Sequence, residues 1–168
     1  MNWEAIGAMG EILGALAVFV SLVYLGIQIR ANTTSMNTAS RQAVANEFRD
    51  WIRFVNKANR IFAEGLANYP KMEFDDRATF CMQMHDLILF YQSTNALYES
   101  GTLEEDVHNR YLTWVAAVLS TSGAGMFWNE WAPTYNAAMT TAVKERLSAG
   151  DLPDVTQYPQ YNLELDAR

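Results

Sequence analysis

The chain has 168 residues, which suits one ordinary domain together with a further segment of about 30 residues. Its formal net charge of -7 disfavours binding to nucleic acid, because a phosphate backbone must be neutralised by Lys and Arg. Charged residues make up only 18% of the chain, which fits a protein with one segment in lipid, and 12% aromatic residues indicate a packed core.

Residues 1–30 are predicted to form a transmembrane helix. Between Ala5 and Ile29 the clearly polar side chains are Glu11, Ser21 and Gln28. A helix of this length spans ~37 Å, which exceeds the ~30 Å of hydrocarbon in a bilayer. Its many Ile, Leu, Val and Phe residues favour insertion by several kcal/mol, and an acid near the membrane edge opposes this by less.

Two other interpretations of this segment are a cleaved signal peptide and a buried helix of a soluble protein. A signal peptide begins with a basic stretch, and residues 1–4 contain no Lys or Arg. A core helix rarely runs this far without charges along one face. Arg30 and Arg41 follow the segment and no basic residue precedes it, so the positive-inside rule predicts an outside N-terminus and a cytoplasmic C-terminal domain.

One stripe of this helix is small or polar, and we call it the seam. Because small residues let two helices approach closely, and Ser and Gln can hydrogen-bond across the gap, the stripe predicts a helix-helix contact. A seven-residue repeat favours left-handed crossing, whereas an isolated GxxxG pair allows a right-handed one. The alternative is that glycine is simply common in membrane helices. The seam consists of Gly7, Gly10, Gly14, Ala17, Ser21, Tyr24 and Gln28.

Glu11 borders the seam. An acid inside a membrane marks a functional site by default: it can be protonated, pair with a cation of a partner subunit, or line a wet gap between helices. The alternative is an interfacial position, because Glu11 lies only about two turns from Trp3 and could reach the lipid headgroups.

The segments GEILGALAV from Gly10, SLVYL from Ser21 and QIRANT from Gln28 follow one another closely. Together they form the pattern G-E-x-x-G-A-x-A-V-x-x-S-L-x-Y-L-x-x-Q-I-R-x-N-T, which resembles the opening of a broad group of small, uncharacterised bacterial membrane proteins. The resemblance covers about the first 33 residues. It implies a bacterial source, and therefore the inner membrane, with a single anchor. It implies no known activity and no catalytic residue.

Residues 31–42 are rich in Asn, Thr and Ser and indicate a polar connector or an exposed helical stalk. Residues 43–150 are predicted to form a helical cytoplasmic domain. Its first helix follows apolar spacings of three and four from about Ala43 and ends before the loop at Tyr69-Pro70. A second helix, central to the domain, begins at Asp75 or Asp76 and ends at Gly101.

Thr102 and Glu105 form a predicted capping box that opens a third helix. Residues 120–125 are expected to interrupt the helical structure. Pro133 suits the first turn of a fourth helix that runs to about Ser148. Residues 151–168 are predicted to form an extended or loosely docked tail. The prediction is therefore an all-α protein, with one N-terminal transmembrane helix followed by a small bundle of about four helices.

No catalytic, metal-binding or phosphate-binding motif stands out. Cys81 and His85 share a helix face, but two ligands do not make a metal site, and a packed cysteine and a satisfied histidine are the simpler interpretation. His108 is expected in an exposed first turn. Trp128 and Trp131 could clamp a ligand, rest on a membrane surface or fill the core. We therefore expect no metal and no cofactor, and His85 with the two tryptophans marks a possible pocket or interface.

The favoured function is that of a non-enzymatic membrane protein. It would assemble through the seam, either with itself or as an accessory subunit of a larger membrane complex, and its partners would be membrane lipid and another membrane helix. One alternative is an oligomeric ion channel that turns Glu11, Ser21 and Gln28 toward a common axis. Another is a membrane-anchored enzyme or ligand sensor with a pocket near His85 and Trp128.

Overall fold

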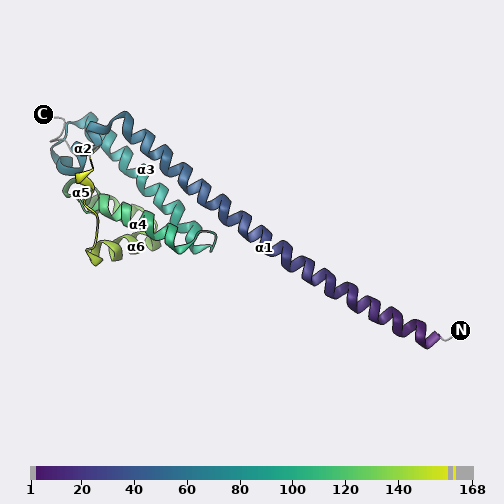
Figure 1. Ribbon diagram of the computed structural model, residues 1–168. Helices are drawn as coiled ribbons and strands as arrows, with labels where there is room; N and C mark the ends of the chain where they lie inside the picture. The colour runs from purple at the N-terminus through teal and green to yellow at the C-terminus, as the bar shows by residue number, and fades with distance from the viewer. Residues whose placement is uncertain (1–2, 159–160, 162–168) are drawn as a thin grey trace. The chain divides into compact units, whose positions relative to one another are not determined.

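The computed structural model describes residues 3–158 and residue 161 of the chain. These residues contain six α-helices, three short 3-10 helices and no strand, which confirms the all-α class (Figure 1). The chain divides into two compact units, Met1–Ala39 and Ser40–Arg168. The second unit contains the end of the first helix and five further α-helices, which is more than the expected four.

Helix α1 (Trp3–Lys57) supplies every described residue of the first unit and continues into the second. Residues 31–42 are helical throughout, so the helical alternative for this polar segment is the observed one. Its hydroxyl groups donate to carbonyl oxygens one turn earlier, as in Thr33 to Ile29 at 3.0 Å and Thr34 to Arg30 at 3.0 Å. These bonds let Thr side chains stay in a helix instead of competing with its backbone.

The amphipathic helix expected from Ala43 is interrupted at Ala58, where α1 ends and α2 (Asn59–Asn68) begins. Ala58 has φ -137° and ψ 46°, which are not helical values. Neither Gly nor Pro marks this break. The Ala58 carbonyl instead accepts a long hydrogen bond of 3.5 Å from the amide of Gln83, a fully buried side chain of the next long helix. The same carbonyl also accepts from the Phe62 N–H at 3.2 Å, so the break lies where a local and a tertiary contact meet.

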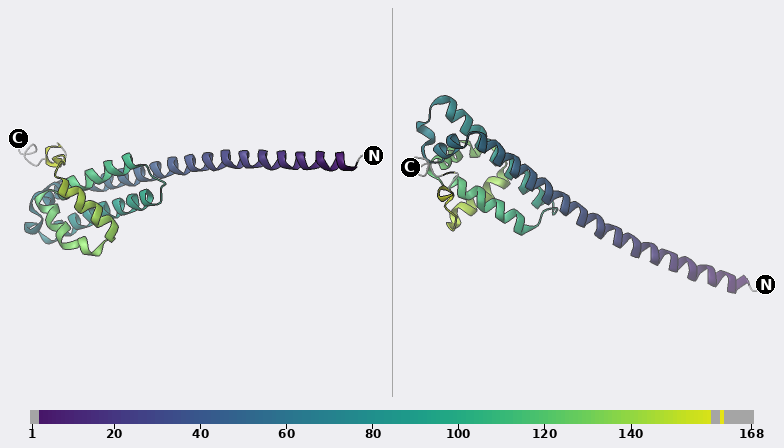
Figure 2. Two further views of the ribbon diagram at one scale, coloured as in Figure 1. Left: turned by 90° about the horizontal axis from the view of Figure 1, so that it is seen from below. Right: turned by 45° about the horizontal axis from the view of Figure 1, so that its top comes forward.

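The 3-10 helix η1 (Tyr69–Lys71) leads into α3 (Phe74–Glu99), which lies beside the end of α1 in both views of Figure 2. The N-cap of α3 is Glu73, so the cap expected at Asp75 or Asp76 is wrong. Those two acids lie in the first turn instead, where the helix dipole favours them. The central role of α3 is confirmed by a row of buried side chains, namely Phe80, Gln83, Met84, Leu87, Ile88, Phe90, Tyr91, Thr94 and Asn95.

The end of α3 follows the expectation from its glycine. Gly101 has a φ of 73°, a left-handed conformation that glycine adopts without a steric penalty. The capping box expected next is wrong, because the N-cap of α4 (Glu105–Leu119) is Glu104. The Thr102 hydroxyl turns back to the Leu97 carbonyl at 3.1 Å and so belongs to the turn after α3.

The break expected over residues 120–125 is limited to Ser120 and Thr121, because α5 (Ser122–Trp131) contains both nearby glycines. A Cβ atom at Gly123 would lie 1.9 Å from the Gly65 carbonyl oxygen of α2, so glycine here permits a close backbone approach rather than a bend. Gly65 is equally enclosed, because a Cβ atom there would lie 2.1 Å from the Phe80 ring.

Pro133 lies in the 3-10 helix η2 (Ala132–Thr134) and not in the first turn of the last helix. That helix, α6 (Ala137–Ala149), is capped by the side chain of Asn136, which accepts from two backbone N–H groups at 2.9 and 3.2 Å. The short η3 (Val155–Gln157) follows. Within the segment expected as an extended or loosely docked tail, Val155 is 1% exposed and so packs into the core.

Aromatic rings form much of the core of the second unit. Trp51 is 1% exposed, stacks on Phe48 and meets Trp114 edge-on, and its indole N–H donates to the Gln83 carbonyl at 2.9 Å. The end of α1 is thereby tied to α3 and α4 by buried contacts within this unit.

Candidate functional site

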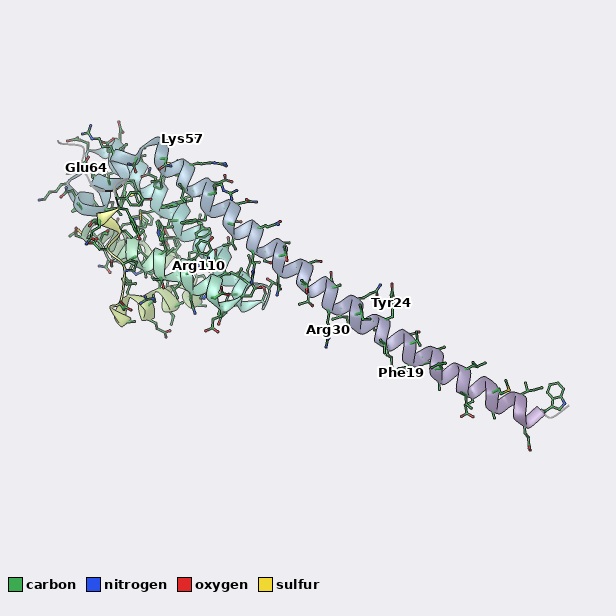
Figure 3. The ribbon with its side chains drawn as sticks, in the orientation of Figure 1. Phe19, Tyr24, Arg30, Lys57, Glu64 and Arg110 are labelled. Carbon is green, nitrogen blue, oxygen red and sulfur yellow. The ribbon has the colours of Figure 1, made fainter. Side chains whose placement is uncertain are left out.

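The first candidate site is the apolar segment from Ile6 to Ile29 of α1. Among the described residues, one helix is long and apolar enough to cross a membrane, and none of its most apolar stretch is buried. Phe19 and Tyr24 project outward from this helix in Figure 3, with exposed fractions of 64% and 61%. A row of large apolar side chains exposed in this way is unfavourable in water and favourable in hydrocarbon.

The polar side chains of the seam each take part in a hydrogen bond within the helix. The Ser21 hydroxyl donates to the Ala17 carbonyl at 2.8 Å, and the Gln28 amide donates to the Tyr24 hydroxyl at 3.0 Å. Both bonds lower the cost of entering a medium that offers no hydrogen-bonding partners. The acceptor sites that remain on these side chains can still bond to a neighbouring helix.

The glycines of the seam have no close neighbours among the residues that the structure describes. A Cβ atom added at Gly7, Gly10 or Gly14 would meet nothing within 4 Å. The same holds for Gly26, which lies off the seam on the same helix. Because glycine costs about 1 kcal/mol relative to Ala in a helix in water, the helix alone gains nothing from these residues. Their surroundings among the described residues therefore leave room for a neighbouring helix.

Glu11 is exposed beside the seam, and no described residue forms an ion pair with it. Any ionic partner of Glu11 therefore lies outside the described residues.

The second candidate site is the half-buried ring of His85 on α3. Its Nδ1 atom is hydrogen-bonded to the Tyr135 hydroxyl. The rings of Trp131 and Phe127 meet the imidazole edge-on, with centroids at 4.8 and 5.1 Å. Burial lowers the pKa of His85 and raises the pKa of Tyr135 to about 12, so both groups are neutral near pH 7.

The structure places the three residues expected near a pocket in one aromatic cluster. Trp131 touches His85 directly, whereas Trp128 reaches it through Tyr135, against which it stacks at 6.2 Å. Trp128 is 4% exposed and fills the core, and Trp131 is half-buried beside the surface. The sequence signal missed Tyr135, because an isolated Tyr carries no indication of its partner.

His108 is buried, with 5% of its surface exposed, so the expectation of an exposed first turn is wrong. Its Nε2 atom lies 2.9 Å from the Tyr91 hydroxyl and 3.1 Å from the side-chain Oδ1 of Asn95, and the Tyr98 ring stacks on the imidazole with 4.2 Å between centroids. The Asn95 amide in turn donates to Glu99 at 2.9 Å. This network joins α3 to α4, and burial lowers the pKa of the imidazole.

Cys81 is half-buried, and its thiol donates to the Tyr69 hydroxyl at 3.6 Å rather than to His85. Over residues 3–158 and 161, no three His, Cys, Asp or Glu side chains come together as metal ligands would.

Comparison with protein-family models, with curated proteins and with solved structures finds no match to this chain. The candidate sites are therefore interpreted from their own geometry.

Proposed function

We propose that the protein is a non-enzymatic, single-pass membrane protein whose α1 helix associates through the seam with another membrane helix. The partner is a second copy of this chain or a subunit of a larger membrane complex. The helical unit Ser40–Arg168 would then be held at the membrane by α1. The observation that carries this proposal is the recurrence of small residues at Gly7, Gly10 and Gly14 along one face of α1 that no described residue covers.

The contrast among the glycines of this chain supports the proposal. Gly65 and Gly123 each occupy a position where even a methyl group would collide with the neighbouring helix. The seam glycines meet no such constraint, yet they recur at the spacing of a helix-helix contact. Lipid imposes no preference for small residues on one side, whereas a second helix does, because close approach increases van der Waals contact.

The test compares full-length wild type with Gly10→Leu and Gly14→Leu in a native-like bilayer, with oligomeric state read by cross-linking and native electrophoresis. Each bulky side chain is expected to separate the helices and to shift the complex toward monomer. Gly26→Leu is the matched control, because this glycine has equally open surroundings but lies off the seam. A complex that survives both seam variants, or that Gly26→Leu disrupts equally, argues against the seam.

The same experiment separates the two kinds of partner. If the complex contains only this chain, its mass is a multiple of 19.0 kDa, whereas an accessory subunit co-purifies with other chains. Ser21 and Gln28 each form a hydrogen bond within α1, which lowers the cost of placing them in lipid and so supports association over ion conduction.

The proposal includes an orientation in a bacterial inner membrane. Arg30 and Arg41 lie on the C-terminal side of the apolar segment, which supports a cytoplasmic Ser40–Arg168 unit. Protease added to intact spheroplasts should leave that unit undigested, and protease added after lysis should cleave it. Digestion in intact spheroplasts would reverse the orientation.

A further inference from the structure

A surface hollow of about 440 Å³ lies where η1, the first two turns of α3 and the end of α5 meet. This volume falls in the range of small-molecule sites, about 300 to 1,000 Å³. The hollow is separate from the apolar segment of α1 and from the His108 network. Its walls are Tyr69, Pro70, Phe74, Arg77, Ala78, Cys81, Glu130 and Trp131.

Two opposite charges line this hollow without neutralising each other. Arg77 is half-buried, and no described residue forms an ion pair or a side-chain hydrogen bond with its guanidinium. Glu130 is exposed, and its carboxylate accepts a hydrogen bond from the Tyr69 hydroxyl, with 3.0 Å between the two oxygens. That bond uses one carboxylate oxygen and leaves the other free to accept. The hollow therefore offers a cation and an anion, and neither has an ionic partner within the part of the chain that the structure describes.

Three aromatic residues, Tyr69, Phe74 and Trp131, also line this hollow. Tyr69 is 8% exposed and held by Glu130 and by the Cys81 thiol, while Trp131 is packed against His85. Phe74 is 73% exposed in the first turn of α3, where a large apolar side chain has little to contact within the chain. The faces of Trp, Tyr and Phe rings attract cations, most of all alkylated ammonium groups.

We propose that this hollow binds a small zwitterion, with its ammonium group against Glu130, Tyr69 and Trp131 and its phosphate or carboxylate toward Arg77. A ligand that carries both charges satisfies both walls. A simple cation or anion leaves one charge of the hollow unpaired and gains less. This inference does not depend on the seam of α1, so each can fail without the other.

The test is calorimetric titration of full-length protein in a maltoside detergent, whose headgroup is uncharged. The probes are choline, inorganic phosphate, phosphocholine and glycine betaine. At least one of the two zwitterions is expected to bind about tenfold more tightly than either single ion, because a second charge-assisted contact is added. Arg77→Gln should lower the affinity for this zwitterion to that of choline, and Glu130→Gln should lower it to that of the single anion.

Arg110→Gln is the matched control, since Arg110 is an exposed arginine of α4 that pairs only with Asp106 at 3.6 Å among the described residues (Figure 3). It should leave every affinity unchanged, and unchanged thermal melting of all three variants excludes unfolding as the cause of a loss. A soluble short-chain phosphatidylcholine that binds more tightly than phosphocholine points to a lipid headgroup, and equal affinity points to a free small molecule. Zwitterions that bind no better than single ions, or that are insensitive to both hollow variants, overturn the proposal.

Discussion

Replacing Gly123 by Ala tests the close approach of α2 and α5. The added Cβ atom would lie 1.9 Å from the Gly65 carbonyl oxygen and 3.0 Å from the Leu66 carbonyl group. All of these are backbone atoms, so no side chain can rotate to make room. The two helices must separate by more than an ångström or the backbone must distort.

The expected cost is that of a severe overpacking, about 3 kcal/mol, offset by about 1 kcal/mol because Ala is a better helix former than Gly. The net loss in the free energy of unfolding is therefore about 2 kcal/mol. For a unit of about 130 residues such as Ser40–Arg168, this corresponds to a fall in melting temperature of roughly 7 °C.

The assay is thermal melting of the full-length protein in detergent, followed by circular dichroism. Gly125→Ala is the control on the same helix, where the Cβ atom would meet the Leu119 carbonyl oxygen at 3.2 Å. That contact requires a shift of only a few tenths of an ångström, so the melting temperature should change by less than about 3 °C. If Gly123→Ala has the same melting temperature as Gly125→Ala, the backbones of α2 and α5 do not pack this closely.

Two further predictions concern the membrane and pH. Leu16→Arg should reduce the fraction of protein that resists alkaline carbonate extraction, since an Arg at the centre of the helix raises the free energy of membrane insertion by on the order of 3 kcal/mol. The control Leu16→Ala should not reduce that fraction. Full release of the wild type by carbonate contradicts insertion. Burial lowers the pKa of His108 below its ordinary 6.5, so the unfolded state binds more protons just below that pH. Stability contributed by neutral His108 is complete above pH 6.5 and is lost as the pH falls toward the folded pKa. His108→Gln should make the decline in melting temperature between about pH 7 and 5 shallower. The decline that remains is expected from His85, whose pKa is also lowered by burial. A decline as steep as that of wild type contradicts a neutral, buried His108.

Some features of this protein could be predicted from local patterns. The apolar segment of α1, the central α3 and the stop at Gly101 each depend on residues adjacent in the chain or one turn apart. Hydrophobic periodicity and the left-handed preference of glycine act within one element, so they can be recognised without its neighbours.

Other features depend on partners distant in sequence. The glycines of α5 suggested a break, because glycine in isolation favours irregular backbone, yet Gly123 is helical and lies where α2 approaches closely. Conversely, Ala58 is a good helix former within a helical pattern, yet the helix is interrupted there, beside Gln83 of α3.

The sequence by itself determined the all-α class, the apolar helix and the spacing of its seam, since these follow from local composition and helical period. Only the tertiary structure decided that His108 is buried, that His85 meets Tyr135, and that Arg77 and Glu130 line one hollow. The physical reason is that burial and charge pairing depend on which surfaces the chain brings together. Residues from α3 and α5 acquire a shared environment only when those helices pack.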